Sequence, residues 1–245
     1  MSGHSKWATI KRKKGKTDVA RAKAWNKLIK EISVAAKLGG GDVDANPRLR
    51  AAVLKAKGQS LPAKNIESSI AKATGAGASE NVEEPMYEGY GPSGTAILVK
   101  CMTDNKTRTV ADVRNAFSKN GGNLGEQGSV SWGFKYQGVI LVDANAYPED
   151  KVMDLVLETG AEDMSTEDDV HEITTTPEGF AAVTKALEDA KIEMMDAELT
   201  YVHSTPVKLE GDAAQKLLKL VEKLEDLEDV QDVYHNAELN DSDLE

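Results

Sequence analysis

Lysine and arginine side chains gather near the amino terminus, where their spacing suits contact with a row of phosphate groups. They follow one another along a first segment and then recur every three or four residues, which is helical spacing. Cations in this arrangement can follow a nucleic-acid backbone, although they could also serve only to solvate a helical surface. We expect a nucleic-acid-binding surface made of Lys6, Lys11, Arg12, Lys13, Lys14, Lys16, Lys23, Lys27 and Lys30.

The net charge of −11 is unevenly distributed along the 245 residues. Residues 1–72 hold 17 Lys and Arg against 5 Asp and Glu, a net charge of +12, whereas residues 73–245 hold 13 against 36, a net charge of −23. An acidic body repels nucleic acid, so we expect contact to be confined to the amino-terminal part. Few side chains there suit the reading of base edges, which favours recognition of backbone or shape.

Three other motifs could carry chemistry, and for each we favour a structural interpretation. The GKT at residues 15–17 ends like a phosphate-binding loop, but Ile10 stands where that loop needs its first glycine. The glycine-rich segments 89–94 and 121–129 could hold phosphate through backbone N–H groups, yet they lack the strand-to-helix context and are interpreted as turns. Residues 104–109 are interpreted as a helix cap, with Arg108 paired to a nearby aspartate.

Residues that could support catalysis or bind a metal are few and scattered. The single cysteine, Cys101, lies in a predicted strand with no histidine near it in sequence, which is typical of a core residue. The acidic clusters at 167–169 and 225–229 lack the spacing of an EF-hand loop and are interpreted as solvated turns. We therefore expect no catalytic residue, no metal site and no cofactor, and we expect that the protein is not an enzyme.

The amino-terminal part is predicted to form three helices. The first begins at Asp18 and ends at the glycines 39–41, the second follows Asn46-Pro47, and the third runs from about residue 61 to Ala73. The inward face of the first helix should hold Ala22, Trp25, Ile29, Ile32 and Ala36, opposite its lysines. The inward residues of the other two should be Leu49, Ala52, Val53, Ala56, Ile66 and Ile70.

Strands alternate with helices in the rest of the chain. Strands are predicted at 95–102 and 129–134, with a helix at 107–120 between them. A complete β-α-β-β-α-β series follows, with strands at 138–144, 162–165, 170–175 and 192–199 and helices at 149–159 and 178–190. A helix at 212–227 and a strand at 230–236 remain. The segment 95–134 by itself is half a domain that lacks one helix and one strand, and these two elements supply them.

These patterns predict an α+β protein of three domains. They are a basic three-helix domain at 1–79 and two ferredoxin-like α+β domains, of which one is discontinuous and made of 80–137 and 200–245, and the other, at 138–199, is inserted into it. No apolar run is long enough to span a bilayer, and the first residues lack the apolar stretch of a secretory signal. We expect a cytoplasmic protein without a membrane partner.

Five segments are similar to signature segments of the YebC/PmpR family, and they extend over nearly the whole chain. They are GHSKW at 3–7, AAKLGGGDVDANPRLRAA at 35–52, YEGYGPSGTA at 87–96, TDNKTRTVADVRNAFSKNGGNLGEQGSV at 103–130 and DVQDVYHNAE at 229–238. Departures are small: Val43 stands where relatives often have proline, Trp25 where phenylalanine is common, and Lys106-Thr107 replaces an Arg-Asn pair.

The resemblance implies a helical amino-terminal bundle followed by two α+β domains. It also implies a regulator of gene expression that binds nucleic acid. Of the two functions it suggests, the preferred one is a DNA-binding transcriptional regulator. The alternative is a ribosome-associated translation factor that binds ribosomal RNA and relieves stalling at proline-rich sequences, since relatives act as translational activators. DNA or ribosomal RNA is then the expected partner, with proteins of the ribosome or of the transcription machinery as further partners.

Overall fold

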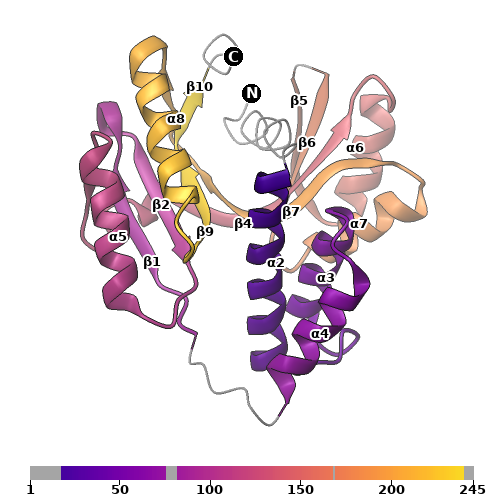
Figure 1. Ribbon diagram of the computed structural model, residues 1–245. Coiled ribbons are helices and arrows are strands. Elements are labelled where there is room, and N and C mark those ends of the chain that lie inside the picture. Colours follow the sequence, from indigo (N-terminus) through magenta and orange to yellow (C-terminus); the bar gives the residue numbers. More distant parts are fainter. Residues whose placement is uncertain (1–17, 76–81, 168, 240–245) are drawn as a thin grey trace.

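The computed structural model describes residues 18–75, 82–167 and 169–239 (Figure 1). The amino-terminal helical unit consists of α2 (Asp18–Gly39), α3 (Pro47–Gly58) and α4 (Ala63–Thr74). Asn46 fixes the start of α3, because its side chain accepts a hydrogen bond from the backbone N–H of Leu49 and donates to the carbonyls of Ala35 and Gly40. Pro47 suits the first turn, where its missing N–H costs nothing.

The core of the helical unit agrees with the predicted inward faces, with one exception. The α3 residues Leu49, Ala52, Val53 and Ala56 are all buried, and they pack with Ile32 and Ala36 of α2 and Ile66 of α4. Ala22, expected in the core, is exposed, because the packed cluster begins one turn later at Trp25. The indole N–H of Trp25 donates to the carbonyl of Gln59 at 3.0 Å.

A four-stranded antiparallel sheet of order β3-β1-β2-β9 forms the second unit. Its strands are β1 (Met86–Tyr90), β2 (Ala96–Cys101), β3 (Asn123–Leu124) and β9 (Val230–His235). Strand β9 comes from near the end of the chain and pairs with β2, with Ile97 opposite His235. The pairing of β2 with β9 therefore joins an early and a late part of the sequence in one sheet, as expected.

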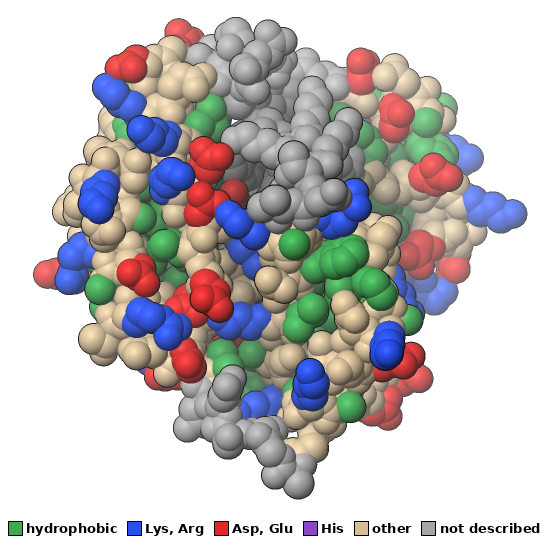
Figure 2. Space-filling model, in the orientation of Figure 1, with side chains coloured by type: hydrophobic (Ala, Val, Ile, Leu, Met, Phe, Trp, Pro, Cys, Tyr) green, Lys and Arg blue, Asp and Glu red, His purple; other side chains and the backbone are tan. Residues whose placement is uncertain are grey.

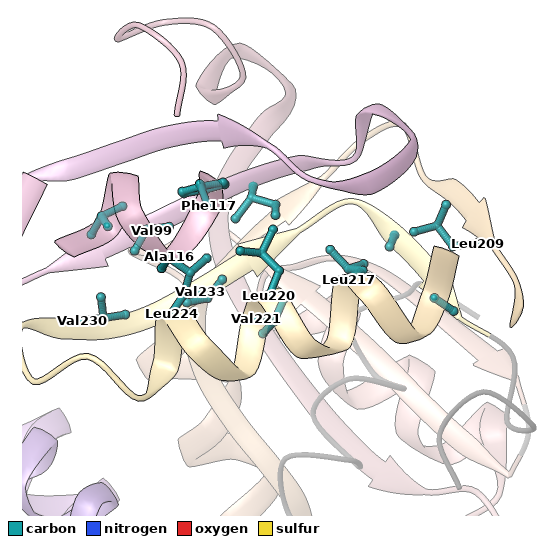
Figure 3. Close-up of a cluster of buried hydrophobic side chains, with 14 of the residues drawn as sticks. Val99, Ala116, Phe117, Leu209, Leu217, Leu220, Val221, Leu224, Val230 and Val233 are labelled. Atoms are coloured by element: carbon teal, nitrogen blue, oxygen red, sulfur yellow. The ribbon is translucent and has the colours of Figure 1, made fainter. Parts of the chain in front are cut away.

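Helices α5 (Lys106–Lys119) and α8 (Gly211–Glu225) pack with this sheet. Figure 3 shows Leu217, Leu220 and Leu224 of α8 pointing toward the strands and toward Phe117 of α5. These side chains are fully buried. A short parallel pair, β8 (Val207–Leu209) with β10 (Ala237–Leu239), extends the same cluster.

The third unit has the sheet order β5-β6-β4-β7, with all neighbouring strands antiparallel. The elements are β4 (Phe134–Asp143), α6 (Glu149–Glu158), β5 (Ala161–Glu167), β6 (Val170–Thr175), α7 (Phe180–Asp189) and β7 (Met194–His203). This is the split β-α-β arrangement of ferredoxin-like domains. Strands β4 and β7 pair from Phe134 opposite His203 to Val142 opposite Met194, forming one ribbon between the second and third units (Figure 1).

The α+β class, with an amino-terminal helical unit and two α+β units, is confirmed. The residue boundaries 1–79, 80–137 with 200–245, and 138–199 stay a proposal, and the β4–β7 ribbon passes through two of them without interruption. Residues 76–81 are not described, so the chain is followed up to residue 75 at the end of the helical unit and again from residue 82 before β1.

The strand predicted at residues 129–134 is wrong. This segment forms the short 3-10 turn η2 (Ser131–Gly133), and β4 begins only at Phe134. The carboxylate of Glu88 accepts hydrogen bonds from the backbone N–H groups of Gly128, Val130 and Ser131 at 2.7, 2.8 and 2.8 Å. These donors point to a carboxylate instead of a neighbouring strand, so the segment cannot join the sheet.

Candidate nucleic-acid interface

The predicted cationic surface is described only along α2. Its first six members, Lys6, Lys11, Arg12, Lys13, Lys14 and Lys16, lie outside the described residues, as does the GKT motif. The other three, Lys23, Lys27 and Lys30, occupy one side of α2 at intervals of four and three residues. The structure therefore brings these three lysines together, as their helical spacing predicted.

These three lysines contact the acidic second unit between the end of α8 and the first residues of β9. Lys23 Nζ lies 2.6 Å from Asp226 Oδ1, and Lys30 Nζ lies 3.1 Å from Asp229 Oδ1. Lys27 Nζ donates to the carbonyl of Gln231 at 3.2 Å. In Figure 2, basic and acidic side chains adjoin where the left-hand part of the molecule meets its centre. We call Lys23, Lys27 and Lys30 with these three partners the α2 contact.

Asp229 is the most heavily bonded acceptor of the α2 contact. Its Oδ2 accepts hydrogen bonds from the hydroxyls of Thr103 and Thr109 and from the guanidinium of Arg108, at 3.1, 2.9 and 2.8 Å. Burial alone would raise the pKa of Asp229, but hydrogen bonds from Arg108, Thr109 and Lys30 outweigh it and lower the pKa to about 2. Asp229 is therefore a charged group that ties α2 to α5 and to the end of β2.

Helix α3 makes a second set of contacts with the acidic units. Arg48 forms bidentate salt bridges with Glu31 of α2 and with Glu84. The shortest N to O distances in these two salt bridges are 2.7 and 2.6 Å. The hydrogen bond from Arg48 lowers the pKa of Glu84 despite partial burial. Lys55 Nζ lies 3.0 Å from Glu198 Oε2 of β7. The helical unit is thus attached to both acidic units through opposite charges.

The sequence interpretation missed the acidic partners in these contacts. The cluster at 225–229 was expected to be a solvated turn, which is wrong for Asp229, because only 7% of that residue is exposed. Asp226 and Asp229 both follow the end of α8 at Glu225, so their spacing is not a helical repeat that could have indicated a partner for the lysines. Which lysine meets which carboxylate depends on the packing of distant elements, and no local pattern contains that information.

The corner at residues 104–109 is a helix cap, as predicted. The side chain of Asn105 accepts a hydrogen bond from the backbone N–H of Arg108 at 3.1 Å, and Arg108 pairs with Asp104 at 2.9 Å. The additional pair between Arg108 and Asp229 was not predicted. This corner therefore supports the α2 contact from the side of α5.

The glycine-rich loop at 121–129 does use backbone N–H groups to hold an anion, but the anion is Glu88 of the protein itself. Burial would raise the pKa of Glu88, and the N–H groups of the loop outweigh it and lower the pKa. Gly121 and Gly128 have φ values of +77° and +87°, which glycine adopts without strain. The interpretation of these glycines as turn residues is confirmed.

Cys101 and His171, two groups that could support catalysis, both lie in the interior of the protein. Cys101 is fully buried in β2, and burial raises the pKa of its thiol to about 12. His171 is buried and its two ring nitrogens contact Thr166 and the carbonyl of Tyr147. Within residues 18–75, 82–167 and 169–239, no three His, Cys, Asp or Glu side chains gather as metal ligands. None of the helices described there is long and apolar enough to cross a membrane.

These features define a three-unit α+β protein whose cationic helical unit is held on two acidic units by ion pairs. The family models described as "TACO1/YebC protein N-terminal domain" and "TACO1/YebC second and third domain" match residues 5–76 and 82–237. The chain belongs to the TACO1/YebC family, and the predicted resemblance is confirmed.

Curated relatives match along their whole length. Proteins named "probable transcriptional regulatory protein" from Desulforapulum autotrophicum and Treponema denticola are 51% and 52% identical, with 98% of this chain and 98% and 97% of theirs covered. The crystal structure of a conserved hypothetical protein from Aquifex aeolicus is similar, with a TM-score of 0.82 and 41% identity. That comparison covers 93% of this chain and 94% of the other.

Proposed function

We propose that this protein is a non-catalytic, cytoplasmic regulator of gene expression that binds nucleic acid through its basic amino-terminal part. The observation that carries the proposal is the charge division, with a net charge of +12 in residues 1–72 against −23 in the remainder. Phosphate backbones match such a concentrated positive charge. The names of the relatives favour regulation of transcription, and hence DNA as the partner.

The binding surface in this proposal begins with Lys6, Lys11, Arg12, Lys13, Lys14 and Lys16 and continues with the lysines of α2. The carboxylates of the other two units confine the contact to this end of the molecule, because they repel phosphate. Proteins of the transcription machinery would then contact the acidic units.

Reversal of charge at positions 11–14 tests the binding surface. We expect the quadruple variant Lys11→Glu, Arg12→Glu, Lys13→Glu and Lys14→Glu to bind a mixed-sequence DNA duplex at least about tenfold more weakly, because several phosphate contacts are lost. If the natural chain neutralises about five phosphates, the logarithm of its binding constant should fall with the logarithm of salt concentration at a slope of roughly −4. Fluorescence anisotropy over a series of NaCl concentrations measures both quantities.

The control makes the same charge change elsewhere. Lys119, Lys151, Lys208 and Lys219 are exposed lysines of the two acidic units, and all four are changed to glutamate in the control variant. A purely global charge effect would weaken duplex binding equally in both variants and would contradict the proposed surface. A salt slope near zero in the natural chain would contradict phosphate binding altogether.

A translation factor that binds ribosomal RNA is the second candidate. The observation that favours it is that the described cationic helix lies along the acidic second unit instead of projecting as a helix free to enter a major groove. Crosslinking in growing cells, denaturing recovery and sequencing of the attached DNA and RNA separate the two. Enrichment of promoter DNA supports the transcriptional function, and enrichment of ribosomal RNA supports the translational one.

A further inference from the structure

The α2 contact joins groups that nucleic acid would also bind. The three lysines lie on one side of α2, and each points its ammonium group at an oxygen atom of the second unit. Two of these oxygens belong to carboxylates, which carry negative charge as phosphate oxygens do. Asp226 and Asp229 therefore occupy positions that phosphates of a bound nucleic acid would take.

We propose that the α2 contact, together with the ion pair between Lys55 of α3 and Glu198, is an autoinhibitory latch, in which Asp226, Asp229 and Glu198 compete with nucleic acid for Lys23, Lys30 and Lys55. This inference rests on the proposed function. An ammonium group that donates to a carboxylate at 2.6 or 3.1 Å cannot present the same N–H bonds to a phosphate. The remaining N–H bonds of each lysine lie beside a carboxylate that repels phosphate, so the closed contact weakens phosphate binding.

Two ion pairs of the latch, Lys23 with Asp226 and Lys55 with Glu198, are accessible to solvent, so they can separate. The side chains of Lys23 and Asp226 are 51% and 41% exposed, and those of Lys55 and Glu198 are 47% and 27% exposed. Ion pairs this accessible to water contribute little to stability and are screened by salt. Asp229 differs, because its threonine and arginine bonds hold it in place whether or not Lys30 is bound.

Opening also lowers repulsion between nucleic acid and the rest of the protein. In the closed form α2 lies between the second and third units, both of which belong to the acidic part of the chain (Figure 1). A phosphate group that approaches Lys23 of α2 or Lys55 of α3 meets the carboxylate of Asp226 or of Glu198. Movement of the helical unit away from them would separate Lys23 and Lys55 from these carboxylates and make both lysines more accessible.

The test weakens the latch without touching a lysine. The variant Asp226→Asn with Glu198→Gln removes two carboxylates from the latch and retains side-chain size. We expect it to bind a mixed-sequence DNA duplex about three- to tenfold more tightly than the control, since a larger fraction of molecules is open. The control is Asp212→Asn with Glu162→Gln, which makes the same change of net charge and breaks two exposed ion pairs outside the latch.

A second measurement follows the opening directly. Lys64→Cys on α4 and Lys219→Cys on α8 place exposed labels on the helical and the second unit, while the buried Cys101 stays unlabelled. We expect energy transfer between the labels to fall when the duplex is added, because binding and opening are linked reciprocally.

The outcomes separate this inference from the proposed function. Tighter binding by the latch variant than by the control, with a fall in energy transfer, supports the latch. Binding that is equal in both variants, or unchanged energy transfer with the duplex bound, overturns the latch and leaves the proposed function intact. If the natural chain and both variants bind neither the duplex nor a ribosomal RNA fragment of the same length, the proposed function fails and the latch fails with it.

Discussion

The variant Asp229→Asn should unfold at a lower urea concentration than the natural chain, with a loss of about 2 to 3 kcal/mol in the free energy of unfolding. Asp229 is 7% exposed, and its carboxylate accepts bonds from Thr103, Thr109 and two cations. An amide of the same shape removes the negative charge and directs an NH₂ group or a weaker acceptor at these donors. Urea unfolding followed by circular dichroism measures the loss.

Asp226→Asn is the matched control for this prediction. It makes the same chemical change three residues earlier, on an exposed carboxylate whose partners are Lys23 and Lys223. Exposed ion pairs contribute at most about 1 kcal/mol, so the control should lose less than that. Equal losses at the two positions would show that Asp229 acts as an ordinary surface charge.

The effect of Asp229 should also depend on pH. Its pKa is lowered to about 2 in the folded protein, from an ordinary value of 3.8. A carboxyl group with a lowered folded pKa stabilises the fold above its unfolded pKa and loses that contribution as pH falls through the folded pKa. The difference in stability between the natural chain and Asp229→Asn should therefore narrow between about pH 4 and pH 2.

The helices were predictable because local residues determine where they begin. Asn46 and Asn105 cap α3 and α5 with their own side chains, and Pro47 suits the first turn of α3. The regular spacing of apolar residues in these segments then identified the buried face. Local chemistry of this kind is fully contained in a window of a few residues.

Pairings between distant parts were predictable only where a unit was visibly incomplete. The segment that holds β1 and β2 needed one more helix and one more strand to form a domain. The late segment supplies α8 and β9, and β9 pairs with β2. No missing element of this kind indicated the role of Glu88, which accepts a hydrogen bond from a loop forty residues later in the chain. The alternating residues at 129–134 therefore predicted a strand, whereas the N–H groups of that loop are directed at a carboxylate.

The predicted cationic face of α2 was correct in its residues but incomplete in its surroundings. Helical spacing placed Lys23, Lys27 and Lys30 on one side, and the structure agrees. Sequence reasoning treated this side as open to solvent or ligand, whereas it contacts Asp226 and Asp229. Charge alone cannot distinguish a surface that binds phosphate from one that binds a carboxylate of the same chain, because both anions attract lysine equally well.

The variant Glu88→Gln should lose about 2 to 4 kcal/mol in the free energy of unfolding and should loosen residues 125–133. Glu88 is 5% exposed, and both of its oxygens accept bonds from backbone N–H groups. Glutamine turns one oxygen into an NH₂ group, so either Gly128 or the pair Val130 and Ser131 faces another donor. Hydrogen exchange of this segment and urea unfolding measure the two effects.

Glu126→Gln is the control, because Glu126 is an exposed glutamate of the same loop and the chemical change is identical. It should leave both the exchange rate and the unfolding free energy nearly unchanged, as expected for a surface substitution. If the two variants exchanged equally fast, the bonds to Glu88 would not be what holds the loop.

Acid should reproduce the effect of Glu88→Gln in the natural chain. Because the N–H groups of the loop lower the pKa of Glu88, its stabilising contribution is present above the ordinary glutamate pKa of about 4.5 and is lost as pH falls through the lower folded value. Exchange in residues 125–133, corrected for the intrinsic effect of pH, should then accelerate on acidification in the natural chain and stay fast in the variant. Trp132, which is 78% exposed and donates its indole N–H to Ser129 at 3.0 Å, lies on this loop and gives a fluorescence signal for the same transition. A natural chain whose loop exchanged at a constant corrected rate down to the pH of unfolding would show that backbone packing, and not the Glu88 carboxylate, fixes the loop.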